Sequence, residues 1–138
     1  LSGAGAGQVA QIFAGTALEA RPVDGGATAA SAVKMAYAGW TKGTAALLLA
    51  LRALAREQGV EDALLAEWAM SQPGLAERSD GAARSAAAKG WRWVAEMEEI
   101  AATMAAAGLP DGFHAAAAEV FRARPATAPS EAPTAPNR

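Results

Sequence analysis

The stretch from Ala29 to Gln58 constrains the fold more than any other part of the chain. It contains no proline and is rich in alanine, the strongest helix former. Its larger side chains recur at spacings of three and four residues, which is the repeat of one helix face. These positions are Val33, Tyr37, Trp40, Thr44, Leu47, Leu48, Leu51 and Leu54. We predict a single helix about 45 Å long, which exceeds the width of a small domain and is therefore shared between domains or subunits.

Shorter helical segments fill most of the remaining chain, and we predict an all-α helical bundle built on the long helix. Gly59 and Gly108 stand where helices are expected to stop, because glycine readily adopts the left-handed conformation that ends a helix. The expected helices cover Ala6–Phe13, Glu61–Met70, Leu75–Ala87, Lys89–Ala107 and a last segment that starts at Pro110 or Asp111. The segment Leu75–Ala87 has the weakest pattern of the five.

The first residues and the last residues differ from this helical pattern. Thr16–Val23 is predicted to be extended, because Pro22 biases the residue before it toward β geometry. One helix and one strand do not form a stable unit, so we interpret residues 1–24 as the end of another domain. Residues 25–124 are then the helical domain. Residues 125–138 are dominated by Pro, Ala, Thr and Ser and are expected to be disordered.

The composition excludes several classes of function. The 138 residues include no cysteine and a single histidine, His114, so disulfides, thiol catalysis and histidine metal clusters are excluded. The net charge is −2 with both signs interspersed, which indicates neither a nucleic-acid nor a membrane surface. The longest apolar run, Ala45–Leu51, is far shorter than the roughly 20 residues of a membrane span. We expect a cytoplasmic protein without a metal site and, because the chain begins at Leu1 rather than Met, a piece of a longer one.

Lys34 is the first candidate for chemistry. Together with Ser31, Ala38 and Thr41 it falls close to one helix face, and the small residues there leave room for a ligand beside the ammonium. A lysine in apolar surroundings can act as a base. The alternative is an ordinary solvated lysine near the start of a helix.

Four other features carry weaker signals. Lys89 opens a helix and could reach the same pocket, or it could lie in water. His114 has no visible partner, which is typical of a structural or surface histidine. The glycines at positions 3, 5 and 7 resemble a nucleotide-binding loop, but no strand precedes them. The four tryptophans are at helical spacing, and we interpret them as packing or interface residues.

Two blocks of residues resemble the C-terminal part of the β-hydroxyacid dehydrogenase superfamily, which includes 3-hydroxyisobutyrate and phosphogluconate dehydrogenases. The first block is Ala30–Gly43 followed by Ala45–Leu51, and the second is Lys89–Ile100 followed by Gly108–Pro110. More narrowly, the chain resembles a helical domain that follows a Rossmann domain in bacterial oxidoreductases. The resemblance covers about residues 1–124.

The resemblance implies an NAD(P)-dependent dehydrogenase or reductase. Its Rossmann domain, of which residues 1–24 would be the last helix and strand, binds NAD or NADP. The helical domain completes the active site and makes a homodimer through the long helix. Lys34 matches the catalytic acid–base lysine, and Lys89 matches a second lysine that contacts the cofactor or the substrate. Ser31, Tyr37, Ala38 and Thr41 are then expected to line the site for a small hydroxy-acid-like substrate.

Two departures from the superfamily pattern leave the substrate open. Ala38 stands where many members have an asparagine that binds substrate, and Gly90 stands where many have an aspartate. Tyr37 lies beside the first position and could supply a hydroxyl instead. A non-enzymatic helical dimerisation module is the alternative function, and the presence or absence of a glycine-rich nucleotide-binding turn upstream of Leu1 would separate the two.

Overall fold

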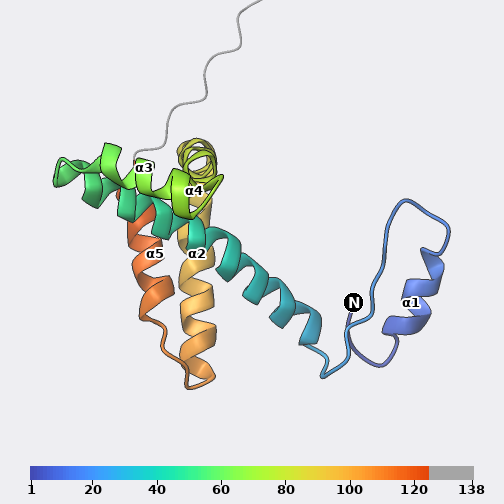
Figure 1. Ribbon diagram of the computed structural model, residues 1–138. Helices are drawn as coiled ribbons and strands as arrows, with labels where there is room; N and C mark the ends of the chain where they lie inside the picture. The colour runs from blue at the N-terminus through green and yellow to red at the C-terminus, as the bar shows by residue number, and fades with distance from the viewer. Residues whose placement is uncertain (125–138) are drawn as a thin grey trace, which may run out of the picture. The chain divides into compact units, whose positions relative to one another are not determined.

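The computed structural model describes residues 1–124, which form helices and no strand (Figure 1). The elements are α1 (Ala6–Ile12), α2 (Ala29–Glu57), α3 (Glu61–Ser71), α4 (Leu75–Ala106) and α5 (Gly112–Arg122). The all-α fold and the long helix predicted from the sequence are thereby confirmed. The chain divides into two compact units, one covering Leu1–Thr41 and one beginning at Lys42. The tail predicted to be disordered, residues 125–138, lies outside the described residues.

The strand predicted over Thr16–Val23 does not form. Two backbone hydrogen bonds pair this segment with residue 1: the Leu1 nitrogen donates to the Arg21 carbonyl at 3.0 Å, and the Val23 nitrogen donates to the Leu1 carbonyl at 2.8 Å. This is the alternation of a single parallel bridge centred on Pro22. A strand needs a neighbour along its whole length, and residue 1 supplies a neighbour at one position only.

Glycines end the helices at both predicted places. Gly59 has φ +69°, the Val60 nitrogen donates to the Ala55 carbonyl at 2.8 Å, and the Gly59 nitrogen donates to the Arg56 carbonyl at 3.0 Å. Gly108, with φ +70°, repeats this arrangement at the end of α4. Both are Schellman motifs, in which a left-handed glycine lets the chain turn back and satisfy the last carbonyls of the helix.

The two helices predicted over Leu75–Ala87 and Lys89–Ala107 are one helix, α4, and the predicted break is wrong. No proline lies between Leu75 and Ala107, and a glycine inside a helix costs only about 1 kcal/mol. The packing of Gly90 offsets that cost, because this residue is buried beside the ring of Phe121 from α5. The tertiary contact of Gly90 with Phe121 therefore stabilises α4 in a segment whose own helical pattern is weak.

The core of the second unit lies where α4 and α5 pack side by side (Figure 1). Trp93 and Phe121 meet edge to face with ring centroids 5.1 Å apart, and Met97 and Phe121 are fully buried. Trp68 is also buried, which agrees with the packing role predicted for the tryptophans. Trp40 and Trp91 are 62% and 66% exposed, so these two are not buried in the core, and an interface role for them stays a prediction.

A polar network around Arg52 joins three helices of the second unit. The Arg52 side chain in α2 is 13% exposed; its Nε donates to Glu61 Oε1 of α3 at 2.5 Å, and its Nη1 donates to Ser79 Oγ at 2.7 Å and to Asp80 Oδ1 at 3.0 Å in α4. The buried Ser79 hydroxyl donates in turn to the Ala76 carbonyl at 2.8 Å. A guanidinium that loses water needs acceptors for its fixed N–H groups, and here one helix brings the donor and two others bring the acceptors.

Glu61 makes the stability of this network depend on pH. Hydrogen bonds from Arg56 and Arg52 lower the pKa of Glu61 below its ordinary value of 4.5. A carboxyl whose pKa is lower in the folded state stabilises the fold above its unfolded pKa, and this contribution is lost as the pH falls through the folded pKa. We expect the difference in melting temperature between wild type and Glu61→Gln to be present at pH 7 and to shrink progressively as the pH is lowered below the ordinary pKa of 4.5.

Glu67→Gln, on the exposed side of the same helix, is the matched control for this pH experiment. Its difference from wild type should stay small at every pH. Thermal unfolding followed by circular dichroism between pH 7 and pH 3 measures both differences. A Glu61→Gln difference that does not change with pH would contradict the network as described.

A second prediction concerns Gly90. A Cβ built there meets the Ala86 methyl at 3.5 Å and the Phe121 ring at 3.7 Å, which are ordinary van der Waals distances. Gly90→Ala should therefore gain helix propensity without a clash and stabilise the chain by about 0.5–1 kcal/mol. Gly74→Ala is the control, because Gly74 has φ +84° and alanine is strained in that conformation. Thermal unfolding should show a raised melting temperature for Gly90→Ala and a lowered one for Gly74→Ala; a lowered value for both would contradict the packing at Gly90.

Candidate functional site

The predicted catalytic face lies on the first part of α2, inside the Leu1–Thr41 unit. At 3.6 residues per turn, its positions fall within about one third of the helix circumference. They are Ser31, Lys34, Tyr37, Ala38 and Thr41. The structure therefore brings these five residues together along one helix. Ser31, Lys34 and Tyr37 are exposed, whereas Ala38 and Thr41 are half-buried.

The polar groups on this face differ in what they can offer a ligand. The Thr41 hydroxyl donates to the backbone carbonyl of Tyr37 at 3.0 Å, with the Ala38 carbonyl at 3.3 Å as its other acceptor. The Thr41 hydroxyl proton is therefore engaged within the helix, and the hydroxyl oxygen can only accept a hydrogen bond from a ligand. The Tyr37 side chain is 68% exposed, and the Lys34 ammonium forms no ion pair with any residue between 1 and 124. Lys34 and Tyr37 are thus the groups on this face whose exposed side chains can contact a ligand.

Lys89, the second predicted site lysine, lies in α4 and belongs to the other compact unit. Its side chain is exposed, and its Nζ lies 5.9 Å from the centroid of the buried Trp93 ring. A lysine over an aromatic face is held by cation–π attraction while its ammonium stays available to an anion. A shared cleft for Lys89 and Lys34 stays a prediction.

His114 lies in the first turn of α5, where its ring meets Phe113 edge to face at 5.2 Å. Its Nε2 lies 3.5 Å from the place where a Cβ on Gly43 would stand, so the imidazole covers the glycine of α2. Its buried Nδ1 has no hydrogen-bond partner among the described residues. This position packs the histidine between α2 and α5, which agrees with the structural role favoured from the sequence.

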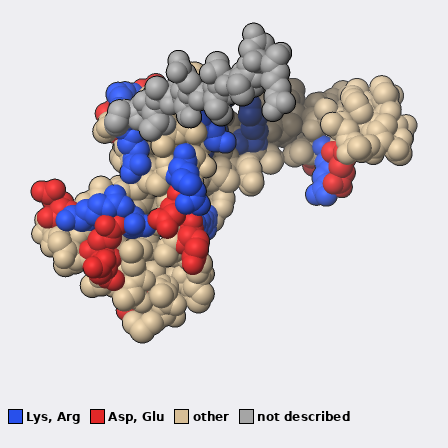
Figure 2. Space-filling model, turned by 90° about the horizontal axis from the view of Figure 1, so that it is seen from above, with Lys and Arg blue, Asp and Glu red and all other residues tan. Residues whose placement is uncertain are grey.

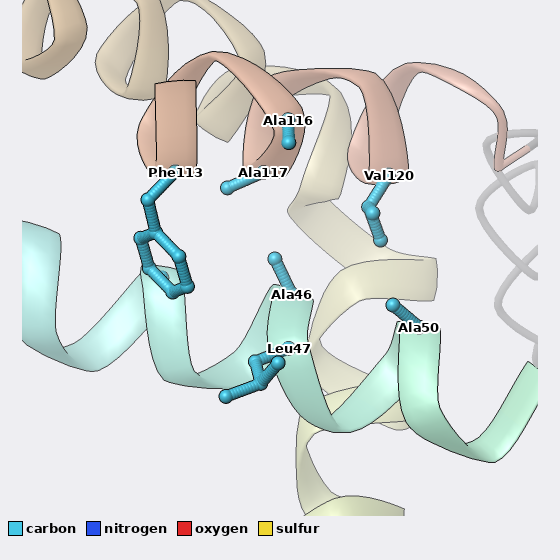
Figure 3. Close-up of a pocket in the computed structure, with 8 residues that line it drawn as sticks. Ala46, Leu47, Ala50, Phe113, Ala116, Ala117 and Val120 are labelled. Carbon is cyan, nitrogen blue, oxygen red and sulfur yellow. The ribbon is translucent and has the colours of Figure 1, made fainter. Parts of the chain in front are cut away.

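A groove that the sequence did not predict lies between α2 and α5. The groove encloses about 200 Å³, and every side chain along it is apolar (Figure 3). Its α2 side consists of Gly43, Ala46, Leu47 and Ala50, and its α5 side consists of Phe113, Ala116, Ala117 and Val120. The signal was present in the sequence as matching spacings of three and four residues in the two helices. The sequence pattern did not predict that these two segments pack against each other.

The apolar stripe predicted along the long helix is only partly buried. Leu48 and Leu49 belong to the core, with exposures of 4% and 3%. Leu47, Leu51 and Leu54 are instead 43%, 39% and 58% exposed, and we call these three residues the leucine face. At 3.6 residues per turn the leucine face lies directly beside the α2 side of the groove. The part of α2 that begins at Lys42 therefore packs one side into the second unit and leaves a second apolar side exposed.

Charged side chains are paired with opposite charges over much of the second unit. Lys42 of α2 pairs with Glu96 of α4, and Arg122 of α5 pairs with Glu98 of α4. On the face shown in Figure 2, basic and acidic side chains lie next to one another. Among residues 1–124, no group of three histidine, cysteine or acidic side chains could hold a metal ion. Within the same residues, no helix combines the length and apolar character needed to cross a membrane.

Comparison with known proteins gives one family match. The profile of a domain of unknown function, DUF1932, matches residues 55–123, which is half of the chain. The match begins near the end of α2 and covers α3, α4 and α5. No curated protein and no solved structure matches the chain.

Proposed function

This chain belongs to the DUF1932 family, whose domain is found in the C-terminal region of 3-hydroxyisobutyrate dehydrogenase-like proteins, and on that premise we propose that it is the helical domain of an NAD(P)-dependent oxidoreductase. In this proposal the domain binds a small hydroxy-acid-like substrate and pairs with a second copy through α2. The enzyme would transfer hydride between the substrate and the nicotinamide in the cytoplasm of a bacterium. The family membership carries the proposal, and the lysine-bearing face of α2 supports it.

Lys34 is the group that we propose for proton transfer. As a neutral amine, it would accept the proton of the substrate hydroxyl while the carbon loses hydride and becomes a carbonyl. In the reverse direction the ammonium would return this proton to the developing alkoxide. The exposed position of Lys34, without an ion pair in residues 1–124, leaves its nitrogen available for that transfer. Tyr37 lies three residues further along α2 and could donate a hydrogen bond to the substrate.

The described residues fit a supporting role in cofactor binding. A nicotinamide dinucleotide, when bound, supplies the hydride acceptor or donor. Its pyrophosphate is usually held by a glycine-rich turn between a strand and a helix, and residues 1–124 form no strand. The cofactor would therefore be held mainly by a separate nucleotide-binding domain. Lys89 offers one exposed cation that could contact a phosphate or the substrate.

A second candidate function is a dimerisation module without catalytic activity. The outward leucine face of α2 favours it, because exposed apolar residues at helical spacing are typical of helix pairing. Under this alternative Lys34 would be a solvated surface residue. The two functions differ in whether replacing Lys34 affects a nicotinamide-dependent reaction.

The first functional test concerns Lys34 in the protein that joins this chain to its nucleotide-binding domain. A panel of hydroxy acids with NAD and with NADP, followed by nicotinamide absorbance, should first identify a substrate. Lys34→Ala should then lower kcat by about 10²–10⁴ because the proton acceptor is lost. The dissociation constant for the cofactor should change little. Wild-type turnover in Lys34→Ala would refute the proposed role.

The second functional test concerns Lys89. Lys89→Ala should weaken cofactor binding about tenfold, because one charge-assisted contact is worth about 1.4 kcal/mol or more. Arg92→Ala, an exposed cation one turn further along α4, is the matched control and should bind as wild type does. Fluorescence titration with the reduced cofactor measures both variants, and circular dichroism checks the helix. Equal affinities for Lys89→Ala and wild type would remove Lys89 from the cofactor site.

A further inference from the structure

We propose that the Lys34 site takes a hydroxy acid whose reacting carbon carries an uncharged apolar group, an aromatic ring above all, and that Tyr37 selects for this group. This substrate class rests on the proposed function. In that reaction the substrate hydroxyl gives its proton to the Lys34 nitrogen, the same carbon gives its hydrogen with the electron pair to the nicotinamide, and a C=O bond forms. Tyr37 contacts the group that this carbon carries.

Charge on this part of α2 is confined to Lys34. Between Gly25 and Thr41 no other residue is acidic or basic. The first unit contains one other basic side chain, Arg21, whose Nη2 pairs with Glu19 Oε1 at 2.6 Å. When Lys34 acts as a base it is neutral, so the face then offers no cation to a phosphate or to a second carboxylate. Because a desolvated anion without a partner is costly, the part of the substrate that lies on this face is uncharged.

Polar and apolar side chains lie on opposite sides of Lys34. At about 100° per residue, Ser31 lies about 60° to one side of Lys34 and Tyr37 about 60° to the other. Val33 lies four residues before Tyr37 and is its neighbour on the helix surface. The Tyr37 and Val33 side chains are 68% and 55% exposed. One side of Lys34 therefore presents an aromatic ring and an isopropyl group to a ligand, and the other side presents a hydroxyl.

The ring of Tyr37 is the largest group exposed beside Lys34. The other positions along this face offer little to a polar substituent, because Ala38 has no polar side-chain atom and the Thr41 hydroxyl donates to the Tyr37 carbonyl at 3.0 Å. Aromatic rings attract one another in offset and edge-to-face arrangements and bury a large apolar area. The face thus favours a substrate with a ring over one with a small or hydrated group.

The test is the ratio of kcat/KM for hydroxy acids that differ only in one group on the reacting carbon. The enzyme is the protein that joins this chain to its nucleotide-binding domain. 3-Hydroxy-3-phenylpropanoate carries a phenyl group there, 3-hydroxybutyrate a methyl group, and malate a carboxylate. We expect wild type to favour the phenyl acid over the methyl acid about tenfold and to turn over malate more slowly than both.

Two variants of Tyr37 separate the ring from the hydroxyl. Tyr37→Ala should lower the phenyl-to-methyl ratio about tenfold through a higher KM for the phenyl acid, because the ring contact is lost. Tyr37→Phe is the matched control and should keep the ratio, since the ring remains and any hydrogen bond of the phenol is common to both acids. The Tyr37 side chain is exposed, so the fold should survive, and circular dichroism verifies this.

A charge added to the apolar side tests the missing cation directly. Val33→Arg places a guanidinium beside Tyr37 and should raise kcat/KM for malate relative to 3-hydroxybutyrate about tenfold, because a charge-assisted hydrogen bond becomes available to the second carboxylate. Val33→Leu, which keeps the side apolar, should leave that ratio as in wild type. Equal malate ratios in both Val33 variants would contradict the charge argument.

Binding without turnover supplies an independent readout. In Lys34→Ala the proton acceptor is absent, and calorimetric titration should still give a lower dissociation constant for the phenyl acid than for the methyl acid. Adding Tyr37→Ala to this variant should remove the difference. Equal dissociation constants for the two acids in Lys34→Ala, or a difference that survives Tyr37→Ala, would overturn the role of Tyr37.

The substrate class and the proposed function can fail separately. If malate is the best substrate and its turnover requires Lys34, the substrate class is wrong and the proposed function stands. If the phenyl acid binds through Tyr37 but supports no nicotinamide reduction that depends on Lys34, the contact stands and the proposed function is refuted.

Discussion

The second unit of this protein depends on the hydrogen bonds of one largely buried guanidinium, that of Arg52. Arg52 lies on the inner side of α2, and its side chain is largely withdrawn from water. Its acceptors come from two other helices, Glu61 from α3 and Ser79 with Asp80 from α4. Losing one of these partners would leave a charge poorly solvated, which is costly in proteins. The network therefore sets the positions of α3 and α4 against α2, and the apolar core of Trp93, Met97 and Phe121 is built on that arrangement.

Small residues determine how closely α2 packs against α5. Alanine and glycine bury little area, so the contact of α2 with α5 leaves a hollow between Gly43 and Val120 instead of a filled seam. The large apolar side chains that could have filled it, Leu51 and Leu54, point outward. Helix α2 thus buries Leu48 and Leu49 with its small residues and leaves Leu47, Leu51 and Leu54 exposed, which suits the pairing of two copies that we propose. This division of labour within one helix connects the fold to the proposed dimer.

The functional proposal rests on family membership and on one helix face. Family membership links the chain to dehydrogenase-like proteins. The proposed chemistry is assigned to Lys34 and Tyr37, which lie on α2 before the matched residues. Thr41 illustrates what side-chain geometry adds, because its hydroxyl proton is used by the backbone of its own helix. Ala38 offers no polar group on the face that carries Lys34, and Gly90 is buried beside the ring of Phe121. The substrate of the proposed enzyme is therefore expected to make fewer polar contacts with this domain.

The local features of this protein follow from its sequence alone. The proline-free run from Ala29, the left-handed glycines 59 and 108 and the 3–4 spacing of apolar residues predicted the helices and their ends, because helix propensity and capping depend on neighbouring residues. Tertiary structure decided the rest. It joined Leu75–Ala106 into one helix through the contact of Gly90 with Phe121, and it left Thr16–Val23 without a sheet to join. Tertiary structure also determines which leucines of α2 are buried. The spacing of apolar residues defines an apolar stripe on the helix, and only packing against other helices defines which part of that stripe is buried.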